Sequence, residues 1–470
     1  MFSPDIFPHL EIVLALAKAR QAKVYLVGGF LRDQKLGKNG TDFDFTVNKK
    51  ALDFARAFAR RVKGAFVLLD KERGCARVVK RQGDAIRTFD FADFRGGKDL
   101  RSDLRLRDFT VNTLCVDMDG DKDCSLPSAA RDLKSKVVRM VGARIFDDDP
   151  LRLLRAFSLS AQTGFTIESR TLSRITKNAH LINRPAMERV REEFFKILAS
   201  PRAFEALKRM DAVGLLERVI PQVAVMRGVK QGGYHHLDVW QHSLEVLHQL
   251  EKLAKDCEDV PLRNYLDEEI GGAHKRLALL KLAALLHDIG KPDTRQAQGA
   301  RMTFHGHEHV GERITRLVAK RLKLSVKERH FLEDVVRMHL RPGYLSNPKR
   351  PTQKALFRYL RDTKEEAASI AFLAMADQRA TRGPLTTEVK AKHHDAICRM
   401  IIDEYFKEKV KPERPRLITG NDLIKALKLK PGPIFAEILT AVEEAQSLGT
   451  ITTKAQALVL ARDTINRVST

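Results

Sequence analysis

Two aspartates two positions apart, Asp42 and Asp44, are the first residues whose types and spacing suggest chemistry. They lie in the segment DFDFTV, whose β-branched and aromatic residues predict a β-strand. Side chains at i and i+2 point to the same face of a strand, so Phe43 and Phe45 are expected on the opposite face. Two adjacent carboxylates repel each other unless a divalent cation or a shared proton compensates their charge. The pair is therefore a candidate magnesium site for in-line attack on a phosphoryl group.

A glycine turn precedes the two aspartates. The segment KVYLVGG predicts a strand that runs into Gly28 and Gly29 and then into a helix. Glycines let the backbone approach a phosphate closely, and the guanidinium of Arg32 is suited to grip phosphate oxygens. A third carboxylate, Asp90, lies in another predicted strand, IRTFDF. Each feature alone is also typical of an ordinary turn or a solvated strand edge, so only their combination indicates phosphate chemistry.

A histidine and an aspartate, His287 and Asp288, follow a strongly apolar predicted helix at 277–286. Burying adjacent ionisable side chains without partners costs several kcal/mol, so their position needs a chemical reason. A lone histidine in such a place is more often a hydrogen-bonded core residue than a metal ligand. Neutral imidazoles with carboxylates nevertheless favour divalent transition metals, and histidines are frequent nearby. These neighbours are His235, His236, His242, His305, His307, His309 and His339.

The length and the hydrophobic pattern divide the chain. With 470 residues, it is expected to form several domains. Predicted strands and helices alternate up to about residue 135, with a strand expected at 111–118, whereas the period is helical almost throughout from 136 onward. We therefore expect an α/β head, a small mixed sheet with helices, followed by helical parts. The expected boundaries are 1–135 for the head, 136–200 for an all-α neck, 201–385 for a helical body and 386–470 for a helical tail.

Charge and cysteine content indicate the kind of partner and compartment. The chain has 84 lysines and arginines against 60 acids, a net charge of +24, which favours a polyanionic partner such as nucleic acid. Five cysteines without CxxC spacing argue against a disulfide framework or a thiolate zinc site. No apolar run is long enough to span a membrane, and the first residues lack the pattern of a secretory signal. We expect a cytoplasmic protein with no membrane partner.

The motifs of the head resemble those of a known family. GGFLRD at 28–33, followed by DFD at 42–44, resembles the signature of class II tRNA nucleotidyltransferases and bacterial poly(A) polymerases. RDFTVN at 107–112 resembles the family's RRDFTxN segment, with a leucine in place of its first arginine. DDPLR at 148–152 resembles the EDxxR nucleotide-recognition helix, with an aspartate in place of glutamate, and ERVREE at 188–193 resembles the end of the neck. Together these segments fall within residues 24–198.

This resemblance implies roles for the matching residues. Asp42 and Asp44 would hold Mg²⁺, and Asp90 would complete the acidic cluster. The basic helices after residue 135 would bind RNA. The implied nucleotide-binding residues are Gly28, Gly29 and Arg32 for the triphosphate, Arg107, Asp108 and Asn112 for the ribose and phosphates, and Asp148, Asp149 and Arg152 as a template for the base, with Arg155 in the same helix. The simpler interpretations are a local ion pair for Arg107 and Asp108 and a helix N-cap for Asp149 before Pro150.

The histidine region resembles a second family. The order His242, His287-Asp288 and Asp377 resembles the HD phosphohydrolase superfamily, and FHGHE at 304–308 looks like the HD domains attached to bacterial tRNA nucleotidyltransferases. The resemblance implies that these four residues bind a divalent transition metal such as Ni²⁺, Mn²⁺ or Fe²⁺. Such a site would activate water to cleave a phosphoester, for example a 2′,3′-cyclic phosphate on an RNA end. The tail segment LITGNDL resembles the C-terminal helices of bacterial members, and we assign it no chemistry.

Taken together, the resemblances imply a template-independent RNA nucleotidyltransferase. It would add CCA, or its CC or A part, to the 3′ end of tRNA from CTP and ATP, with release of pyrophosphate. A bacterial poly(A) polymerase shares these motifs and stays open as an alternative. The segment between Asp90 and Arg107 is short, which keeps a CC-only or A-only enzyme open. An HD phosphohydrolase with a non-catalytic RNA-binding head is a third alternative, although the metal-binding acids of the head are present.

Overall fold

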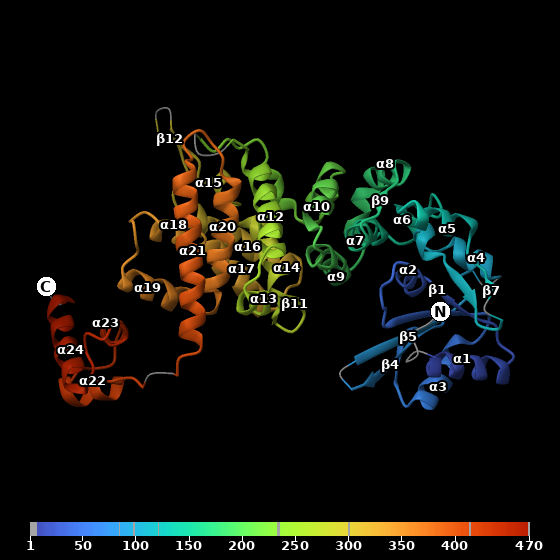
Figure 1. Cartoon of the computed structure of the whole chain (residues 1–470), viewed down its shortest axis with the longest axis horizontal. Helices are drawn as coiled ribbons and strands as arrows, with labels where there is room; N and C mark the ends of the chain where they lie inside the picture. The colour runs from blue at the N-terminus through green and yellow to red at the C-terminus, as the bar shows by residue number, and fades with distance from the viewer. Residues whose placement is uncertain are drawn as a thin grey trace. The chain divides into compact units, whose positions relative to one another are not determined.

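The computed structural model describes residues 7–83, 85–96, 99–120, 122–232, 236–298, 301–412 and 415–468. His235, one of the histidines noted above, lies outside this part. The chain divides into two compact units, Met1–Val219 and Ile220–Thr470, and each is described by itself (Figure 1). In the described part, no helix combines the length and the apolar character needed to cross a membrane.

A seven-stranded mixed sheet forms the head, in the order β3-β4-β5-β2-β1-β6-β7. β2 and β5 run parallel, and the other neighbours pair antiparallel. This arrangement confirms the expected small mixed sheet. The strands are β1 (Val24–Val27), β2 (Asp42–Val47), β3 (Ala65–Asp70), β4 (Cys75–Gln82), β5 (Ala85–Asp93), β6 (Cys115–Asp117) and β7 (Lys122–Asp123).

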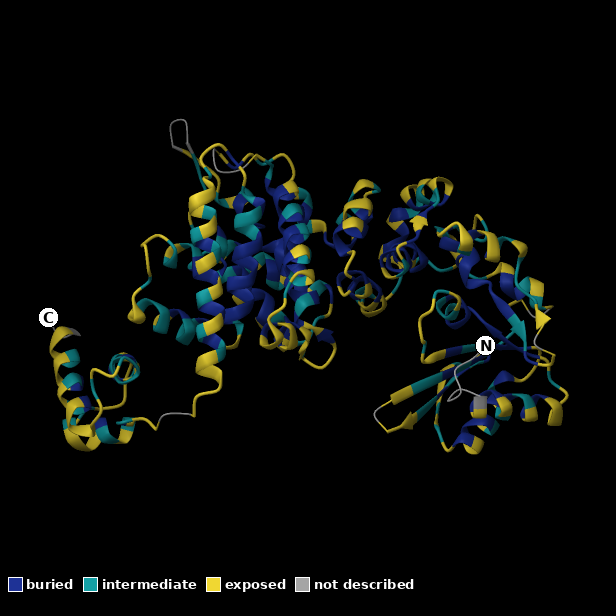
Figure 2. Cartoon of the chain, in the orientation of Figure 1, coloured by how far each residue is buried: buried dark blue, intermediate teal, exposed yellow. Residues whose placement is uncertain are grey.

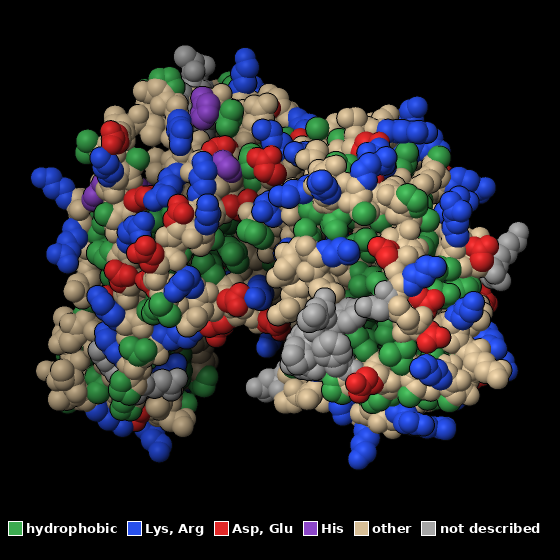
Figure 3. Space-filling model, turned by 45° about the vertical axis from the view of Figure 1, so that its right-hand side comes forward, with side chains coloured by type: hydrophobic (Ala, Val, Ile, Leu, Met, Phe, Trp, Pro, Cys, Tyr) green, Lys and Arg blue, Asp and Glu red, His purple; other side chains and the backbone are tan. Residues whose placement is uncertain are grey.

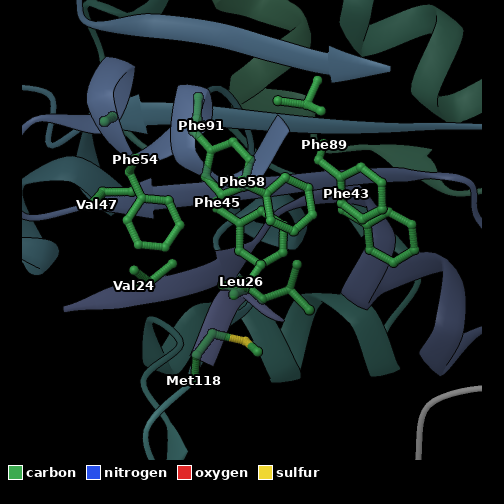
Figure 4. Close-up of a cluster of buried hydrophobic side chains, with 14 of the residues drawn as sticks. Val24, Leu26, Phe43, Phe45, Val47, Phe54, Phe58, Phe89, Phe91 and Met118 are labelled. Atoms are coloured by element: carbon green, nitrogen blue, oxygen red, sulfur yellow. The ribbon is translucent and has the colours of Figure 1, made fainter. Parts of the chain in front are cut away.

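One face of the sheet carries the phenylalanine core of the head (Figure 4). Phe43 and Phe45 of β2 stack on Phe89 and Phe91 of β5, with ring centroids 5.0 Å apart in each pair. Phe58 of the amphipathic helix α3 (Ala51–Val62) packs against both rings of β5. Because these buried rings occupy one face, the aspartates between them on β2 lie on the other.

The strand expected at 111–118 is only partly present, so this prediction is wrong for most of its length. Thr110–Asn112 form a short 3₁₀ helix, and the strand β6 is confined to Cys115–Asp117. Side-chain hydrogen bonds to other segments hold these residues outside the sheet, because Thr110 donates to Asp132 and the Asn112 carbonyl accepts from Arg32. A propensity-based interpretation has no access to such non-local partners.

The rest of the first unit is helical, apart from a short parallel pair, β8 (Val137–Val138) and β9 (Thr166–Ile167). A helix α1 (Phe7–Ala19) and a helix α2 (Gly29–Lys35) belong to the head. The helices that follow are α4 (Leu100–Arg105), α5 (Pro127–Lys134), α6 (Ile145–Asp148), α7 (Arg152–Thr163), α8 (Ser169–Asn178), α9 (Met187–Leu198), α10 (Ala203–Ala212) and α11 (Leu215–Val219).

The second unit is built around two buried helices, α14 (Arg276–Leu286) and α20 (Ala367–Ala380), which appear dark blue in Figure 2. α12 (Val239–Lys255) packs against both of them. Two short antiparallel strand pairs interrupt the helices: β10 (Glu269–Ile270) with β11 (His274–Lys275), and β12 (Gln296–Gln298) with β13 (Arg301–Thr303). The other helices are α13 (Val260–Asp267), α15 (Lys291–Thr294), α16 (His307–Arg321), α17 (Val326–Met338), α18 (Arg341–Leu345), α19 (Gln353–Thr363) and α21 (Glu388–Lys409).

The last three helices have a small apolar core of their own. They are α22 (Gly420–Leu427), α23 (Ile434–Ser447) and α24 (Lys454–Val468), and Leu423, Ile438 and Ala461 are among their buried residues. The helical character expected after residue 136 is thus confirmed.

Replacing Phe89 with alanine is expected to destabilise the head by about 3–5 kcal/mol, because a fully buried ring leaves a cavity beside three other rings. Urea unfolding followed by circular dichroism measures the loss. The single tryptophan, Trp240, belongs to the second unit, so its fluorescence should show an unchanged transition.

Ile86→Ala on the same strand is the matched control, because Ile86 is 46% exposed and should cost little. Equal losses of unfolding free energy in the two variants would contradict the assignment of the phenylalanine face as the core of the head.

Candidate functional site

Asp42 and Asp44 lie side by side on the face of β2 that is free of phenylalanines. In the parallel register with β5, Asp42 is opposite Thr88 and Asp44 is opposite Asp90. The Thr88 hydroxyl donates a hydrogen bond of 2.5 Å to Oδ1 of Asp42. The structure therefore brings the three carboxylates singled out in the sequence onto one patch of the sheet.

Asp90 already has a cationic partner. Arg77 of β4 donates two hydrogen bonds of 2.8 Å to the Asp90 carboxylate, one from Nε and one from Nη2. This bidentate pair compensates the charge of Asp90 and fixes its orientation beside Asp44. Among the described residues, no lysine or arginine forms an ion pair of this kind with Asp42 or Asp44, so the negative charge of the patch is concentrated on them.

The environment of Asp44 fits a divalent cation. Burial raises the pKa of the Asp44 carboxyl above its ordinary value, and the guanidinium of Arg107 only partly offsets this rise. The nearby charges of Asp90 and Asp42 raise the pKa further. Carboxylate oxygens are the ligands that Mg²⁺ prefers, and its charge would relieve this repulsion. Asp42 and Asp44 are accordingly the residues that would hold it.

The glycine turn lies directly against this patch. Gly28 adopts a φ of +86°, and a Cβ at this position would lie 3.2 Å from both Oδ2 of Asp44 and Nη1 of Arg107. Any other residue would be strained there and would crowd the carboxylate. The guanidinium of Arg32 is next to Gly29, since a Cβ on Gly29 would lie 3.5 Å from its Nη2.

A chain of side-chain contacts links the residues expected to bind the nucleotide. Nη1 of Arg32 donates to the Asn112 carbonyl at 2.6 Å, and the Asn112 amide donates to Asp108 at 3.0 Å. The other carboxylate oxygen of Asp108 is 3.1 Å from Nη2 of Arg155 on α7. Arg32 is also held by Asp33 through two hydrogen bonds of 2.8 and 2.9 Å. Residues far apart in the sequence thus form one connected network.

Asp108 is the buried centre of this network. Burial alone would raise its pKa, but Arg155, the Asn112 amide and the Phe109 N–H outweigh that effect and lower the pKa to about 2. The carboxylate is therefore ionised at neutral pH and available to orient both Asn112 and Arg155. These contacts do not support the simpler interpretation of Asp108 as the partner of Arg107 in a local ion pair.

The residues expected to read the base lie where α6 meets α7. Arg152 is buried, and its guanidinium donates to the main-chain carbonyls of Leu106 and Ile145. Asp149 accepts a hydrogen bond from the Leu151 N–H, a capping contact, and lies 3.6 Å from Arg189 of α9. Asp148 is exposed at the end of α6.

Six metal-ligand side chains gather at the centre of the second unit. His242, His287 and Asp377 form one group, and Asp288, His307 and His339 form another, with the donor atoms of each group within 4.8 Å of one another. Asp288 lies between the groups, because its Oδ2 is 3.2 Å from Nε2 of His287 and its Oδ1 is 3.3 Å from Nε2 of His307. All four residues singled out in the sequence belong to this cluster.

Main-chain carbonyls fix three of the imidazoles for metal binding. Nδ1 of His287, His307 and His339 donates to the carbonyl oxygen three residues earlier, at 2.9, 2.8 and 2.6 Å. In the neutral ring, Nε2 then carries the lone pair, the form in which an imidazole binds a metal. Within the described residues, the buried Nε2 of His287 has no hydrogen-bond partner. This donor set fits one or two divalent transition metals.

The surroundings of the cluster keep two of the ligands, His339 and Asp288, in the forms that bind a metal. Burial, together with the neighbouring imidazoles of His287 and His307, lowers the pKa of His339 to about 3, so it is neutral at pH 7. His287 and Lys291 hold the pKa of Asp288 below its ordinary value, against the effect of burial. Nζ of Lys291 is 2.6 Å from Oδ2 of Asp288 and donates to Gln231.

His307 and His339 were noted in the sequence only as nearby histidines, and their place among the ligands was missed. His307 begins α16 and His339 follows α17, so only the tertiary packing brings them to Asp288. Gly290 makes this approach possible, because a Cβ there would lie 2.1 Å from the carbonyl oxygen of His307. The sequence did contain a signal for this approach, the glycine that ends HDIG at 287–290. A glycine at this place leaves room for another helix to pack closely.

Comparisons with known proteins agree with this arrangement. Family models match the chain in order along its length. They are described as a poly A polymerase head domain at 24–139, a "probable RNA and SrmB-binding site of polymerase A" at 164–226, an HD domain at 239–405 and a "tRNA nucleotidyltransferase domain 2 putative" at 389–461. An A-adding tRNA nucleotidyltransferase of Deinococcus radiodurans is 33% identical over 92% of this chain and 93% of its own length. The chain belongs to the tRNA nucleotidyltransferase family.

Further members of the tRNA nucleotidyltransferase family share its length and fold. A CC-adding tRNA nucleotidyltransferase of Thermus thermophilus is 33% identical over 92% of this chain and 91% of its own. The solved structure of a CCA-adding enzyme with ATP shares the fold, with a TM-score of 0.68 and 18% identity over 99% of this chain and 96% of that one. A Thermotoga maritima CCA-adding enzyme with tRNA has a TM-score of 0.65 at 20% identity, over 99% and 96% of the two chains. This family member is therefore an enzyme of nucleotidyl transfer that also carries an HD domain.

The Asp108 network predicts a pH-dependent contribution to stability. A folded pKa of about 2, below the ordinary 3.8, stabilises the fold above about pH 4, and this contribution is lost as the pH falls through 2. This lowering of the pKa corresponds to a contribution of about 2 kcal/mol to the free energy of unfolding. The free energy of unfolding of the wild type should therefore fall by about this amount more than that of Asp108→Asn between pH 6 and pH 2.

Urea unfolding at a series of pH values measures the difference. Asp53→Asn is the control, because Asp53 is an exposed acid on α3, and this variant should follow the wild-type pH profile. Parallel profiles for the wild type and Asp108→Asn would contradict the role of Asp108 as the ionised centre of the network.

Proposed function

We propose that this enzyme adds CCA, or its CC or A part, to the 3′ end of tRNA from CTP and ATP. The observation that carries the proposal is the arrangement of the head site. Asp42 and Asp44 form a patch of carboxylates, and the Gly28 turn lies against it. The network of contacts that begins at Arg32 and ends at Arg155 adjoins them. The net charge of +24 suits an RNA partner, and Figure 3 shows lysine and arginine side chains spread over the visible face. The described cysteines are all free thiols, which supports a cytoplasmic location.

The proposed reaction needs no covalent enzyme intermediate. The 3′-hydroxyl oxygen of the RNA attacks the α-phosphorus of the nucleotide and loses its proton to water. The bond from this phosphorus to the bridging oxygen breaks, and pyrophosphate leaves. Bound Mg²⁺ would supply positive charge that favours the ionised hydroxyl and the developing phosphate charge. Arg32 and Arg107 would neutralise the triphosphate, and Asp108 would orient Asn112 toward the sugar. Asp149 and Arg152 would present donors and acceptors to the base edge.

The relatives favour a partial reaction. The A-adding and CC-adding enzymes match over more than nine-tenths of this chain, whereas a multifunctional CCA protein of Pasteurella multocida, 30% identical, matches over 66% of it. The connection between β5 and α4 is also short, since Asp93 ends the strand and Leu100 begins the helix. We therefore propose that the enzyme adds either CC or A and that another enzyme adds the remainder. A poly(A) polymerase is the alternative that the same motifs allow.

We also propose that the HD domain is a metal-dependent phosphohydrolase. The metals would be Ni²⁺, Mn²⁺ or Fe²⁺, held by the six side chains around Asp288. When bound, such ions lower the pKa of water and polarise a phosphoryl oxygen. The tautomers imposed on His287, His307 and His339 support this assignment, because structural histidines have no need of a common orientation.

Incorporation on defined RNA ends tests the proposed transfer. With Mg²⁺, tRNA lacking CCA should gain two C residues from CTP, or tRNA ending in CC should gain one A from ATP, and addition should then stop. Replacing Asp42 and Asp44 with asparagine should reduce addition on the order of a thousandfold, because the metal ligands are lost. Products are sized at single-nucleotide resolution.

Variants of the HD domain provide the reciprocal control. Asp288→Asn with His287→Ala should abolish hydrolysis of bis(p-nitrophenyl) phosphate and leave nucleotide addition intact. Long A tracts on tRNA and on an unstructured RNA alike would make the enzyme a poly(A) polymerase. Addition that survives the change of both Asp42 and Asp44 would refute the assigned site.

A further inference from the structure

Two cysteines of the head, Cys115 and Cys124, lie opposite each other across an antiparallel strand pair. The register of β6 with β7 sets Val116 opposite Asp123, so the next pair along the ladder is Cys115 with Cys124. The ladder extends to this pair, because the Cys124 N–H donates to the Cys115 carbonyl oxygen at 2.9 Å. Side chains of directly opposite residues point to the same face of a sheet. The two thiols therefore share one face.

Apolar packing keeps these two side chains together. Cys115 is fully buried in a small cluster with Val27 and Leu104, and the half-buried Cys124 packs against the same cluster. Burial raises the pKa of the Cys115 thiol, and the neighbouring Cys124 thiol adds to this rise. Cys115 is therefore a protonated thiol at neutral pH. Cys124 is the member of the pair that a small oxidant in solution reaches first.

The main-chain spacing of this pair suits a disulfide. Opposite residues of an antiparallel ladder have Cα atoms about 4.5–5.5 Å apart. Disulfides join residues whose Cα atoms are about 4.4–6.8 Å apart. Both thiols are free in the structure. The other described cysteines belong to different elements, since Cys75 begins β4, Cys257 follows α12 and Cys398 lies in α21.

The strand that carries Cys115 is tied to the glycine turn of the nucleotide site. β6 lies between β1 and β7, with Cys115 opposite Val27 of β1. The Leu114 carbonyl oxygen, one residue earlier, accepts the Gly28 N–H at 3.0 Å. Gly28 itself lies against Asp44. A change in the position of β6 is therefore passed to the turn and to the carboxylate patch.

Formation of a disulfide would change that position. A disulfide holds its Cβ atoms about 3.8 Å apart, whereas opposite residues in a sheet have Cβ atoms about 4.5–5.5 Å apart. The bond would therefore draw β6 toward β7 and away from β1 by a fraction of this difference. In an active site, a misplacement of about 1 Å can cost about a hundredfold in rate.

We propose that Cys115 and Cys124 are an oxidation site, at which a peroxide forms a reversible disulfide that lowers nucleotidyl transfer. With hydrogen peroxide, the Cys124 sulfur bonds to one oxygen, the O–O bond breaks, and the other oxygen leaves with the thiol proton as water. The Cys115 sulfur then bonds to the Cys124 sulfur, the S–O bond breaks, and the departing oxygen takes the second thiol proton as water. The two thiols lose two electrons, which reduce the peroxide. Thiol–disulfide exchange with an excess of a small thiol reverses the bond.

Peptide mapping of the full-length protein tests the bond itself, independently of any activity. Trypsin cleaves after Lys122, so the two cysteines fall in separate peptides, 108–122 and 123–131. After treatment with hydrogen peroxide, these peptides should be joined in a non-reducing digest, and dithiothreitol should separate them. The proposal is wrong if the joined peptides are missing from protein in which the half-buried thiols of Cys75 and Cys257 have been oxidised.

Nucleotide incorporation on tRNA measures the effect of the bond, and this part rests on the proposed function. The kcat/KM for the incorporated nucleotide should fall at least about tenfold on oxidation of the wild type and recover with dithiothreitol. Cys124→Ser lacks one partner of the bond and should keep its rate after peroxide treatment. Cys115→Ala, which lacks the other partner, should behave in the same way. Cys257→Ser is the matched control, a half-buried thiol of the second unit, and should lose activity as the wild type does.

Three outcomes of these measurements separate the proposals. Oxidised protein that contains the joined peptides but keeps the reduced rate would overturn the inference. Equal loss of activity in Cys124→Ser and the wild type would also overturn it. If the reduced protein adds no nucleotide to any RNA end, the proposed function is wrong. The affinity for CTP with Mg²⁺ then decides the inference, which predicts weaker binding by the oxidised protein and is overturned by equal affinities.

Discussion

The parallel pairing of β2 with β5 is the constraint on which the head depends. It sets two rows of side chains in register, with phenylalanines buried on one face and aspartates on the other. A slip of one residue would move the phenylalanines into solvent and the carboxylates into the core, so the apolar face enforces the register of the polar one. The energy that stabilises the sheet therefore also holds Asp42 and Asp44 side by side against their mutual repulsion.

The HD domain positions its ligand side chains in a different way. Its ligands come from separate helices and their ends, and main-chain carbonyls in or just before those helices accept Nδ1–H from three histidines. Each ring is thus oriented by the segment that carries it before any metal binds. Close packing at Gly290 then brings His307 over Asp288. In both units, neutral packing positions charged groups that would otherwise avoid one another.

The sequence predicted the parts of these sites that depend on local periodicity. Alternation along a strand was enough to place Asp42 and Asp44 on one face, and the apolar run before His287 predicted the buried helix. The pairing of Asp90 with Arg77 and the link from Arg32 to Asn112 join distant segments, so no local pattern contained them. The same reason explains the wrong strand at 111–118, where contacts of Thr110 and Asn112 overrode β-propensity. His307 and His339 were visible as histidines, but only the crossing of α16 and α17 made them ligands.

The central claim is that Asp42 and Asp44 hold the catalytic cation of the head, and Mn²⁺ binding tests it most directly. Electron paramagnetic resonance titration in the presence of CTP, in an Asp288→Asn and His287→Ala background, isolates the head from the HD site. We predict that one or two Mn²⁺ ions bind in this background and that Asp44→Asn lowers their affinity at least tenfold, while Asp53→Asn has no effect. Unchanged Mn²⁺ binding after Asp44→Asn would contradict the account.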